Sequence, residues 1–200
     1  MTSDELQEAI ALGREQRGVE FKGPGQRDDA DFMARVTRAI LGMANKEDGG
    51  EVVIGVEDKQ QALNLVGLSA AEHATWKYDD VQSVLSNYAD PFVDIDVAIV
   101  TVGSLTPVVI TVRPFSESPV LCKKDYNNSK TSKRILQAGA LYIRSRGKIE
   151  TVPASTHTQM REVLDRAAEA TARRLIAISR RIQPGPSDAD SFAEEAKDLP

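Results

Sequence analysis

The chain has 200 residues, of which 41% are hydrophobic and 28% charged, with a formal net charge of -5 and one cysteine, Cys122. This composition fits one ordinary globular domain with appendages and excludes a disulfide-stapled scaffold. There is no apolar run of about 18 residues to cross a membrane. The acidic start, Met1 to Glu5, is unlike a signal peptide, so we expect a soluble, cytoplasmic protein without membrane contact.

The first predicted elements are a short helix, a strand and a longer helix. Ser3 is suited to cap the first helix, which Gly13 ends. Residues 18–22 alternate apolar and polar side chains, which predicts a short strand that Gly-Pro-Gly at 23–25 stops. Apolar residues then follow helical spacing over 32–43, which predicts the second helix.

An interior strand is predicted over residues 51–58, which read Glu-Val-Val-Ile-Gly-Val-Glu-Asp. The run is rich in β-branched residues and apolar on both sides, as expected for a strand covered on two faces. Regular alternation would put Asp58 on the same face as Val52, Ile54 and Val56, at the rim of an apolar surface. Glu57 would point the other way.

The remaining elements are a helix, several strands and a long final helix. The pattern predicts a helix over 78–89, a hairpin of strands over 93–102 and 107–115, and strands over 119–124 and 140–144. Residues 59–77 are mixed, and 125–134 read as a mobile polar loop. The fold class is therefore α/β (α+β), with a mixed sheet of five to six strands flanked by helices. Three parts follow: a core over 1–154, a C-terminal helix over 155–183, and an acidic tail over 184–200 that we expect to be disordered.

Three carboxylates are candidates for a metal site. Glu15 and Glu20 flank the first strand, and Asp58 ends the interior strand, so the three could meet. Mg²⁺ or Mn²⁺ would bind such oxygen ligands and could position water at a phosphodiester. The alternative is that they are solvated acids in a chain that has thirty. The sequence has neither a P-loop nor the ligand spacing of a zinc site.

Basic residues concentrate in one segment despite the acidic average. Residues 121–148 contain a single acid, Asp125. Eight bases accompany it: Lys123, Lys124, Lys130, Lys133, Arg134, Arg144, Arg146 and Lys148. These could neutralise phosphates, with backbone contact favoured over base readout because aromatic residues are few. The segment predicts nucleic-acid binding, and the alternative is an ordinary solvated loop.

The motifs together resemble the Schlafen AlbA-type domain, also called divergent AAA-4, over roughly residues 10–155. They are Glu15-x-x-x-x-Glu20-Phe21-Lys22, then residues 40–58 with Ala44-Asn45, Gly49-Gly50 and Ile54-Gly55-Val56-Glu57-Asp58, and finally Gly139-Ala140-Leu141-Tyr142-Ile143-Arg144. The resemblance implies an α/β domain associated with DNA or RNA binding. The family's animal Schlafen proteins include metal-dependent endoribonucleases that act on transfer RNA.

By this resemblance, the three acids of those nucleases map onto Glu15, Glu20 and Asp58, with Glu57 as the alternative to Asp58. The animal nucleases clamp RNA with a doubled core. This chain has one copy, so a comparable clamp would require a homodimer.

The leading hypothesis is a domain that binds nucleic acid, RNA or DNA, with Mg²⁺- or Mn²⁺-dependent cleavage at Glu15, Glu20 and Asp58. The residues predicted to contact nucleic acid are seven of these bases: Lys123, Lys124, Lys130, Lys133, Arg134, Arg144 and Arg146. Lys22 could stabilise the developing charge. The alternative is a non-catalytic regulatory module for duplex DNA or another protein. A third hypothesis is a sensor for an absent effector, with the helix after residue 155 as the connector.

Overall fold

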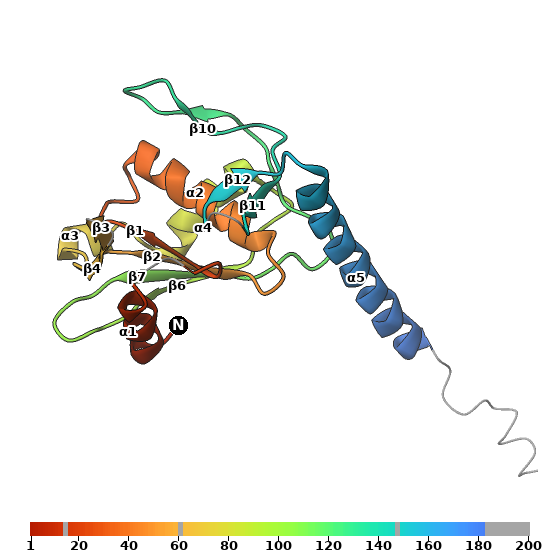
Figure 1. Ribbon diagram of the computed structural model, residues 1–200, viewed down its shortest axis with the longest axis horizontal. Helices are drawn as coiled ribbons and strands as arrows, with labels where there is room; N and C mark the ends of the chain where they lie inside the picture. The colour runs from red at the N-terminus through yellow and green to blue at the C-terminus, as the bar shows by residue number, and fades with distance from the viewer. Residues whose placement is uncertain (14–15, 60–61, 147–148, 183–200) are drawn as a thin grey trace, which may run out of the picture.

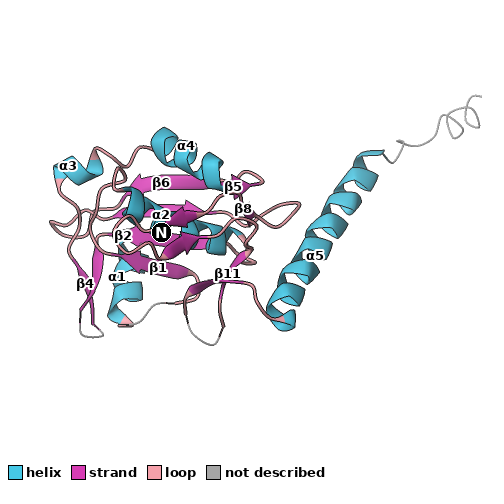
Figure 2. Cartoon of the chain, turned by 90° about the horizontal axis from the view of Figure 1, so that it is seen from above, coloured by secondary structure: helices cyan, strands magenta, loops and turns pink. Residues whose placement is uncertain are grey.

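The computed structural model describes residues 1–13, 16–59, 62–146 and 149–182 of the chain (Figure 1). A central sheet lies between helices, and one long helix, α5 (His157–Ile182), projects away from this body (Figure 2). The mixed α/β class with a long C-terminal helix is confirmed.

The main sheet has four strands in the order β1-β2-β7-β6. They are β1 (Val19–Lys22), β2 (Gly50–Ile54), β7 (Val108–Val112) and β6 (Ile95–Ile99). Strand β1 is parallel to β2, and the other neighbours are antiparallel, so the sheet is mixed. The expected interior strand is indeed interior, and the expected hairpin is β6–β7. The five to six strands expected in one sheet were too many, because the remaining strands form separate two-stranded sheets.

Those small sheets surround the main one. They pair β3 (Val56–Lys59) with β4 (Ala62–Leu65), β5 (Ala89–Asp90) with β8 (Leu121–Cys122), β9 (Tyr126–Asn127) with β10 (Arg134–Leu136), and β11 (Tyr142–Arg144) with β12 (Thr151–Pro153). The mixed stretch after residue 59 therefore contains β4 and a short helix, α3 (Ala70–His73). Cys122 is buried in β8.

Each face of the main sheet has its own core. The larger core packs α2 (Ala30–Ala44) and α4 (Tyr78–Tyr88) against residues such as Val52 and Ile54. The smaller core packs α1 (Ser3–Ala11) against Phe21 and Val53. Alternate residues of a strand point to opposite faces, so β2 contributes to both cores. Its two-sided burial explains the apolar run seen in the sequence.

The N-cap of the first helix lies one residue before the expected one. Thr2, rather than Ser3, is the N-cap: its hydroxyl accepts the Glu5 N–H at 3.3 Å, and the Glu5 carboxylate accepts the Thr2 N–H at 2.6 Å. This reciprocal pair is a capping box, which Ser3 could not make because its third following residue is Leu6.

The expected continuous strand over 51–58 is broken at Gly55, which has φ +105°. A side chain there would be strained by the backbone, and its Cβ would lie 2.7 Å from Leu68 Cδ1. Val56 consequently packs in the α1 core with Val53, not with Val52 and Ile54. Asp58 shares the face of Val56, so the expectation that it shares the face of Val52 and Ile54 was wrong.

Helix α5 touches the body mainly near its start. Val163 is 1% exposed and packs with Leu141 and Ile143. From residue 171 to 182, by contrast, the side chains are exposed. None of the described helices is long and apolar enough to span a membrane. The acidic segment 184–200 lies outside the described residues.

Candidate functional site

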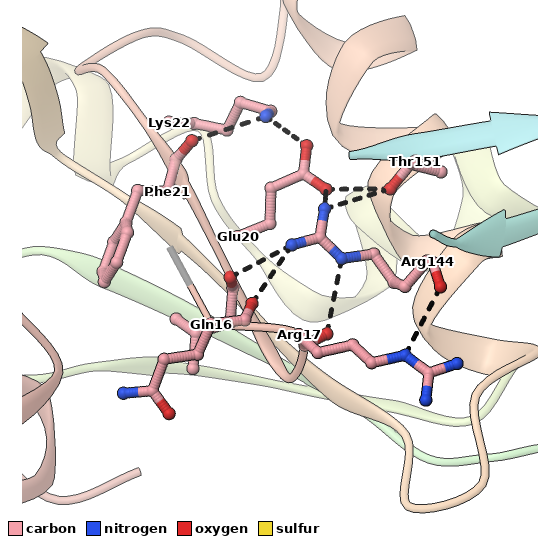
Figure 3. Close-up of polar contacts among 8 residues, drawn as sticks. Gln16, Arg17, Glu20, Phe21, Lys22, Arg144 and Thr151 are labelled. Atoms are coloured by element: carbon pink, nitrogen blue, oxygen red, sulfur yellow. Dashed lines mark hydrogen bonds and ion pairs between the residues drawn. The ribbon is translucent and has the colours of Figure 1, made fainter. Parts of the chain in front are cut away.

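A buried charge cluster forms around Glu20, one of the predicted catalytic acids (Figure 3). Glu20 lies on β1, an edge strand, and is only 7% exposed. Its Oε2 accepts hydrogen bonds from Arg144 Nη1 at 2.6 Å and from Thr151 Oγ1 at 2.9 Å. Its Oε1 accepts from the Lys22 ammonium. Both carboxylate oxygens are therefore engaged by donors of the protein itself.

Arg144, which we expected to contact phosphate, is 2% exposed. Besides Glu20, its guanidinium donates to the carbonyl oxygens of Gln16 at 3.2 Å, Val19 at 3.3 Å and Arg17 at 3.4 Å. The side chain thus ties β11 to the segment that leads into β1 (Figure 3). Because it is buried and bound to protein acceptors, this structure does not support a phosphate contact by Arg144.

The surroundings keep Glu20 ionised. Burial alone would raise the pKa of this carboxyl, but the Lys22 ammonium, the Arg144 guanidinium and the Thr151 hydroxyl outweigh burial and hold the pKa below its usual value. Lys22 is also engaged by acceptors of the protein: its ammonium contacts Glu20 and lies 3.4 Å from the Phe21 carbonyl. The cluster consists of one carboxylate, two cationic side chains that pair with it, and a hydroxyl.

Two of the three acids of the predicted metal site, Glu20 and Asp58, lie among the described residues. Glu15 lies outside the described residues. Asp58 is exposed and shares a face of the β3–β4 hairpin with Val56 and Leu63, which pack in the α1 core. Phe21 of β1 belongs to the same core, and Glu20, its neighbour on the strand, points to the opposite side. Asp58 and Glu20 therefore face different sides of the sheet. Among the described residues, no group of three or more His, Cys, Asp and Glu side chains could hold a metal ion.

Glu57, the alternative third acid, lies beside the end of the predicted motif. Its Cγ is 3.9 Å from the point where a Cβ on Gly23 would stand, directly after Lys22. The set of Glu15, Glu20 and Asp58 stays a prediction, and so does the need for Mg²⁺ or Mn²⁺.

The second feature is a basic hairpin, defined here as residues 123–136, which contains β9 and β10. It stands out from the body above α2 in Figure 1. Five predicted phosphate contacts lie on it, and all have exposed side chains: Lys123, Lys124, Lys130, Lys133 and Arg134. Its one acid, Asp125, pairs with Arg134 at 3.7 Å. The segment expected to be a loop is thus partly a strand pair.

Local hydrogen bonds shape the tip of the basic hairpin. Asn128 Oδ1 accepts the N–H groups of Lys130 at 3.1 Å and Thr131 at 2.8 Å, and the Asn128 N–H donates to the Lys133 carbonyl at 2.8 Å. Ser132 takes up the left-handed conformation, with φ 55°. An asparagine that bonds to the backbone two and three residues ahead is a common turn former. The turn places Lys130 and Lys133 at the exposed tip.

A contact with α2 holds the basic hairpin, and sequence reasoning missed it. The Asp31 carboxylate accepts hydrogen bonds from the Ser129 hydroxyl at 2.6 Å, the Ser129 N–H at 2.9 Å and the Tyr126 hydroxyl at 3.0 Å. Asp31 stands just before the apolar positions 32–43 whose spacing predicts this helix. Nothing in the sequence links it to a serine 98 positions later.

The last predicted basic residue, Arg146, lies apart from the basic hairpin. It is exposed and pairs with Glu162 of α5 at 3.2 Å. Arg17 binds the same carboxylate oxygen at 2.5 Å. The seven predicted basic residues therefore divide into five on the basic hairpin, one that pairs with α5, and one, Arg144, in the interior.

Comparison with known proteins identifies a matching family. A family model described as "Schlafen, AlbA_2" matches residues 15–153. This range contains the Glu20 cluster and the whole basic hairpin. No curated protein matches the chain.

Two solved structures are similar to the chain. One is the DIP2311 protein from Corynebacterium diphtheriae, with 16% identity and a TM-score of 0.47; the match covers 80% of this chain but 27% of that one. The other is the N-terminal domain of a RecG-related protein from Nitrosomonas europaea, with 18% identity and a TM-score of 0.45, covering 78% of this chain and 98% of that one.

Proposed function

The chain belongs to the Schlafen AlbA_2 family, and we propose that it is a nucleic-acid-binding module whose basic hairpin contacts phosphates. The observation that carries the proposal is the charge of this element: five exposed bases and one acid, in a chain with a net charge of -5. Lysine and arginine side chains that neutralise phosphates release condensed counterions, which drives binding. A local excess of positive charge on an acidic protein favours this use.

The exposed side chains of the basic hairpin favour contact with the sugar-phosphate backbone over base readout. Lysine binds phosphate as a point charge and carries no sequence information in such contacts. The hydroxyl of Tyr126 is held by Asp31, which anchors the ring to α2. The proposed partner is therefore a nucleic acid recognised by charge and shape.

Metal-dependent cleavage at Glu15, Glu20 and Asp58 is the alternative raised by the family. The environment of Glu20 argues against it, because Lys22, Arg144 and Thr151 occupy three of the about four lone-pair sites of its carboxylate and two of these donors are themselves cations. A non-catalytic module therefore accounts better for the described residues. The homodimer that a nuclease clamp would require stays a prediction.

The test is binding of a labelled transfer RNA and a labelled DNA duplex across a salt series. Log K falls as log salt rises, and each lost phosphate contact should make this slope shallower by about 0.9 for duplex DNA. Lys130→Ala/Lys133→Ala should therefore make it shallower by about 1.8. The matched control is Lys77→Ala/Arg113→Ala, which removes two exposed bases elsewhere and should leave binding close to wild type. Binding that does not weaken with salt would overturn the proposal.

A second arm separates binding from cleavage. The same transfer RNA is incubated with wild-type protein in Mn²⁺ and in EDTA, beside Asp58→Ala, an exposed position whose substitution should not disturb folding. Intact RNA in all lanes together with salt-sensitive binding supports the module. Cutting that needs Mn²⁺ and is lost in Asp58→Ala would make the protein a nuclease.

A further inference from the structure

We propose that Asp31 is the positioning residue of the basic hairpin, holding its cationic side chains in the arrangement that binds nucleic acid. This inference rests on the proposed function and adds to it a residue that carries the opposite charge to the binding surface. Asp31 lies in the first turn of α2, and its partners are Tyr126 of β9 and Ser129 in the turn after it. Figure 1 shows the basic hairpin above α2.

The contact is extensive for a single side chain. Asp31 Oδ2 accepts the Ser129 hydroxyl at 2.6 Å and the Ser129 N–H at 3.2 Å, while Oδ1 accepts the Ser129 N–H at 2.9 Å and the Tyr126 hydroxyl at 3.0 Å. Hydrogen bonds to an ionised carboxylate are roughly twice as strong as neutral ones. One residue of α2 thus fixes both β9 and the turn that follows it.

The basic hairpin needs such a fixation because its own pairing is slight. Strand β9 has two residues and β10 has three, and their register shifts between Arg134 and Leu136. A two-stranded hairpin is marginally stable by itself in water. Ile135 and Leu136 are buried and hold one end in the larger core. The end that carries Lys130 and Lys133 is held by Asp31.

The position of Asp31 is otherwise unfavourable for the function. A negative charge beside a cationic surface weakens the attraction of an anion. The hydrogen bonds of Ser129 hold the pKa of Asp31 below its usual range, so the group keeps its charge at neutral pH. Ordering the bases before binding lowers the entropy lost on association, and this gain offsets the electrostatic cost.

Charge and position predict opposite results for Asp31→Asn, which makes the test decisive. If only charge mattered, removal of one acid would tighten nucleic-acid binding. Since Asp31 positions the basic hairpin, we expect Asp31→Asn to bind about fivefold more weakly, the equivalent of about 1 kcal/mol. Ser129→Ala, which leaves every charge in place, should weaken binding in the same direction.

The matched control is Asp28→Asn. Asp28 is another acid near the start of α2; it is exposed, and its contact is with Arg27. This variant should bind as tightly as wild type or more tightly. The salt slope of Asp31→Asn should equal that of wild type, because the number of phosphate contacts is unchanged. Wild-type or tighter binding by Asp31→Asn would refute the inference.

Hydrogen–deuterium exchange of residues 125–136 without nucleic acid gives an independent readout. Asp31→Asn and Ser129→Ala should exchange faster there, with Asp28→Asn unchanged. Unchanged exchange in Asp31→Asn, in a protein whose wild type binds nucleic acid, overturns this inference alone. Absence of binding by wild type at low salt overturns the proposed function instead.

Discussion

Asn45 and Val120 are joined by a reciprocal pair of hydrogen bonds: Asn45 Nδ2 donates to the Val120 carbonyl at 2.8 Å, and Asn45 Oδ1 accepts the Val120 N–H at 2.8 Å. Nδ2 also donates to the Tyr142 carbonyl at 3.0 Å. Asn45 is completely buried at the end of α2. The side chain bonds to backbone groups of Val120 as a neighbouring strand would, and it joins the helix to two segments that are distant in sequence.

Substitution of Asn45 should therefore destabilise the fold. A buried polar group left without a partner costs about 1–3 kcal/mol, so Asn45→Ala should lower the free energy of unfolding by about 2–5 kcal/mol. Urea unfolding measures the loss. Asn87→Ala removes an asparagine from the exposed face of α4 and should change stability by less than about 0.5 kcal/mol. Equal stability of the two variants would contradict the role given to Asn45.

The pair of Glu20 and Arg144 should show strong coupling in a double-mutant cycle. Removal of one partner leaves the other charged in the interior, so Glu20→Gln and Arg144→Met should each cost about 3–5 kcal/mol. The double variant should cost clearly less than the sum, because neither charge is then left alone. Chemical denaturation of the four proteins measures the coupling, and additive losses would show that the two side chains act independently.

The same carboxylate should make stability depend on pH in the acid range. The folded protein holds the pKa of Glu20 below its ordinary value of 4.5. Its stabilising contribution is thus complete above that value and is lost as pH falls through the lower folded pKa. The difference in unfolding free energy between wild type and Glu20→Gln should be constant near neutral pH and shrink below about pH 4.5. A difference that grows on acidification would contradict a lowered pKa of Glu20 in the folded protein.

Gly42→Ala should destabilise the protein, against the usual trend in helices. Alanine is ordinarily favoured over glycine in a helix interior by about 1 kcal/mol. Here its Cβ would lie 2.5 Å from Thr151 Cγ2, and overpacking of this kind costs about 1–3 kcal/mol. Thr151→Ser removes that methyl group and keeps the hydroxyl that binds Glu20. Thermal unfolding should show that Thr151→Ser restores most of the stability lost in Gly42→Ala.

Elements with a strong local pattern could be predicted from the sequence. The helical spacing of residues 32–43 gave α2, and the β-branched run after Gly50 gave β2, because burial on one stripe or on two faces leaves a periodic mark. Strand β12 leaves no such mark: it has three residues, ends in proline, and forms only because β11 lies beside it. Short segments whose stability depends on a distant partner carry little local signal.

The candidate site was harder to predict for the same reason. In the alternating strand 19–22, Glu20 and Lys22 have the pattern of solvent-facing residues. Glu20 is covered by Arg144 and Thr151, which lie 124 and 131 positions later in the chain. The motif residues were recognised, but whether a carboxylate faces water, a cation or a guanidinium is set by tertiary contacts. The exposed bases of the basic hairpin were found because charge density is a local property.

The left-handed backbone of Gly55 reverses which side of the chain the even-numbered residues point to. Before it, even-numbered residues of β2 belong to the larger core; after it, the even-numbered Val56 belongs to the α1 core. Two consecutive acids, Glu57 and Asp58, thereby exchange the sides that an unbroken strand would give them. Gly55, a residue without a side chain, thus sets which of the two acids lies on the side to which Glu20 points.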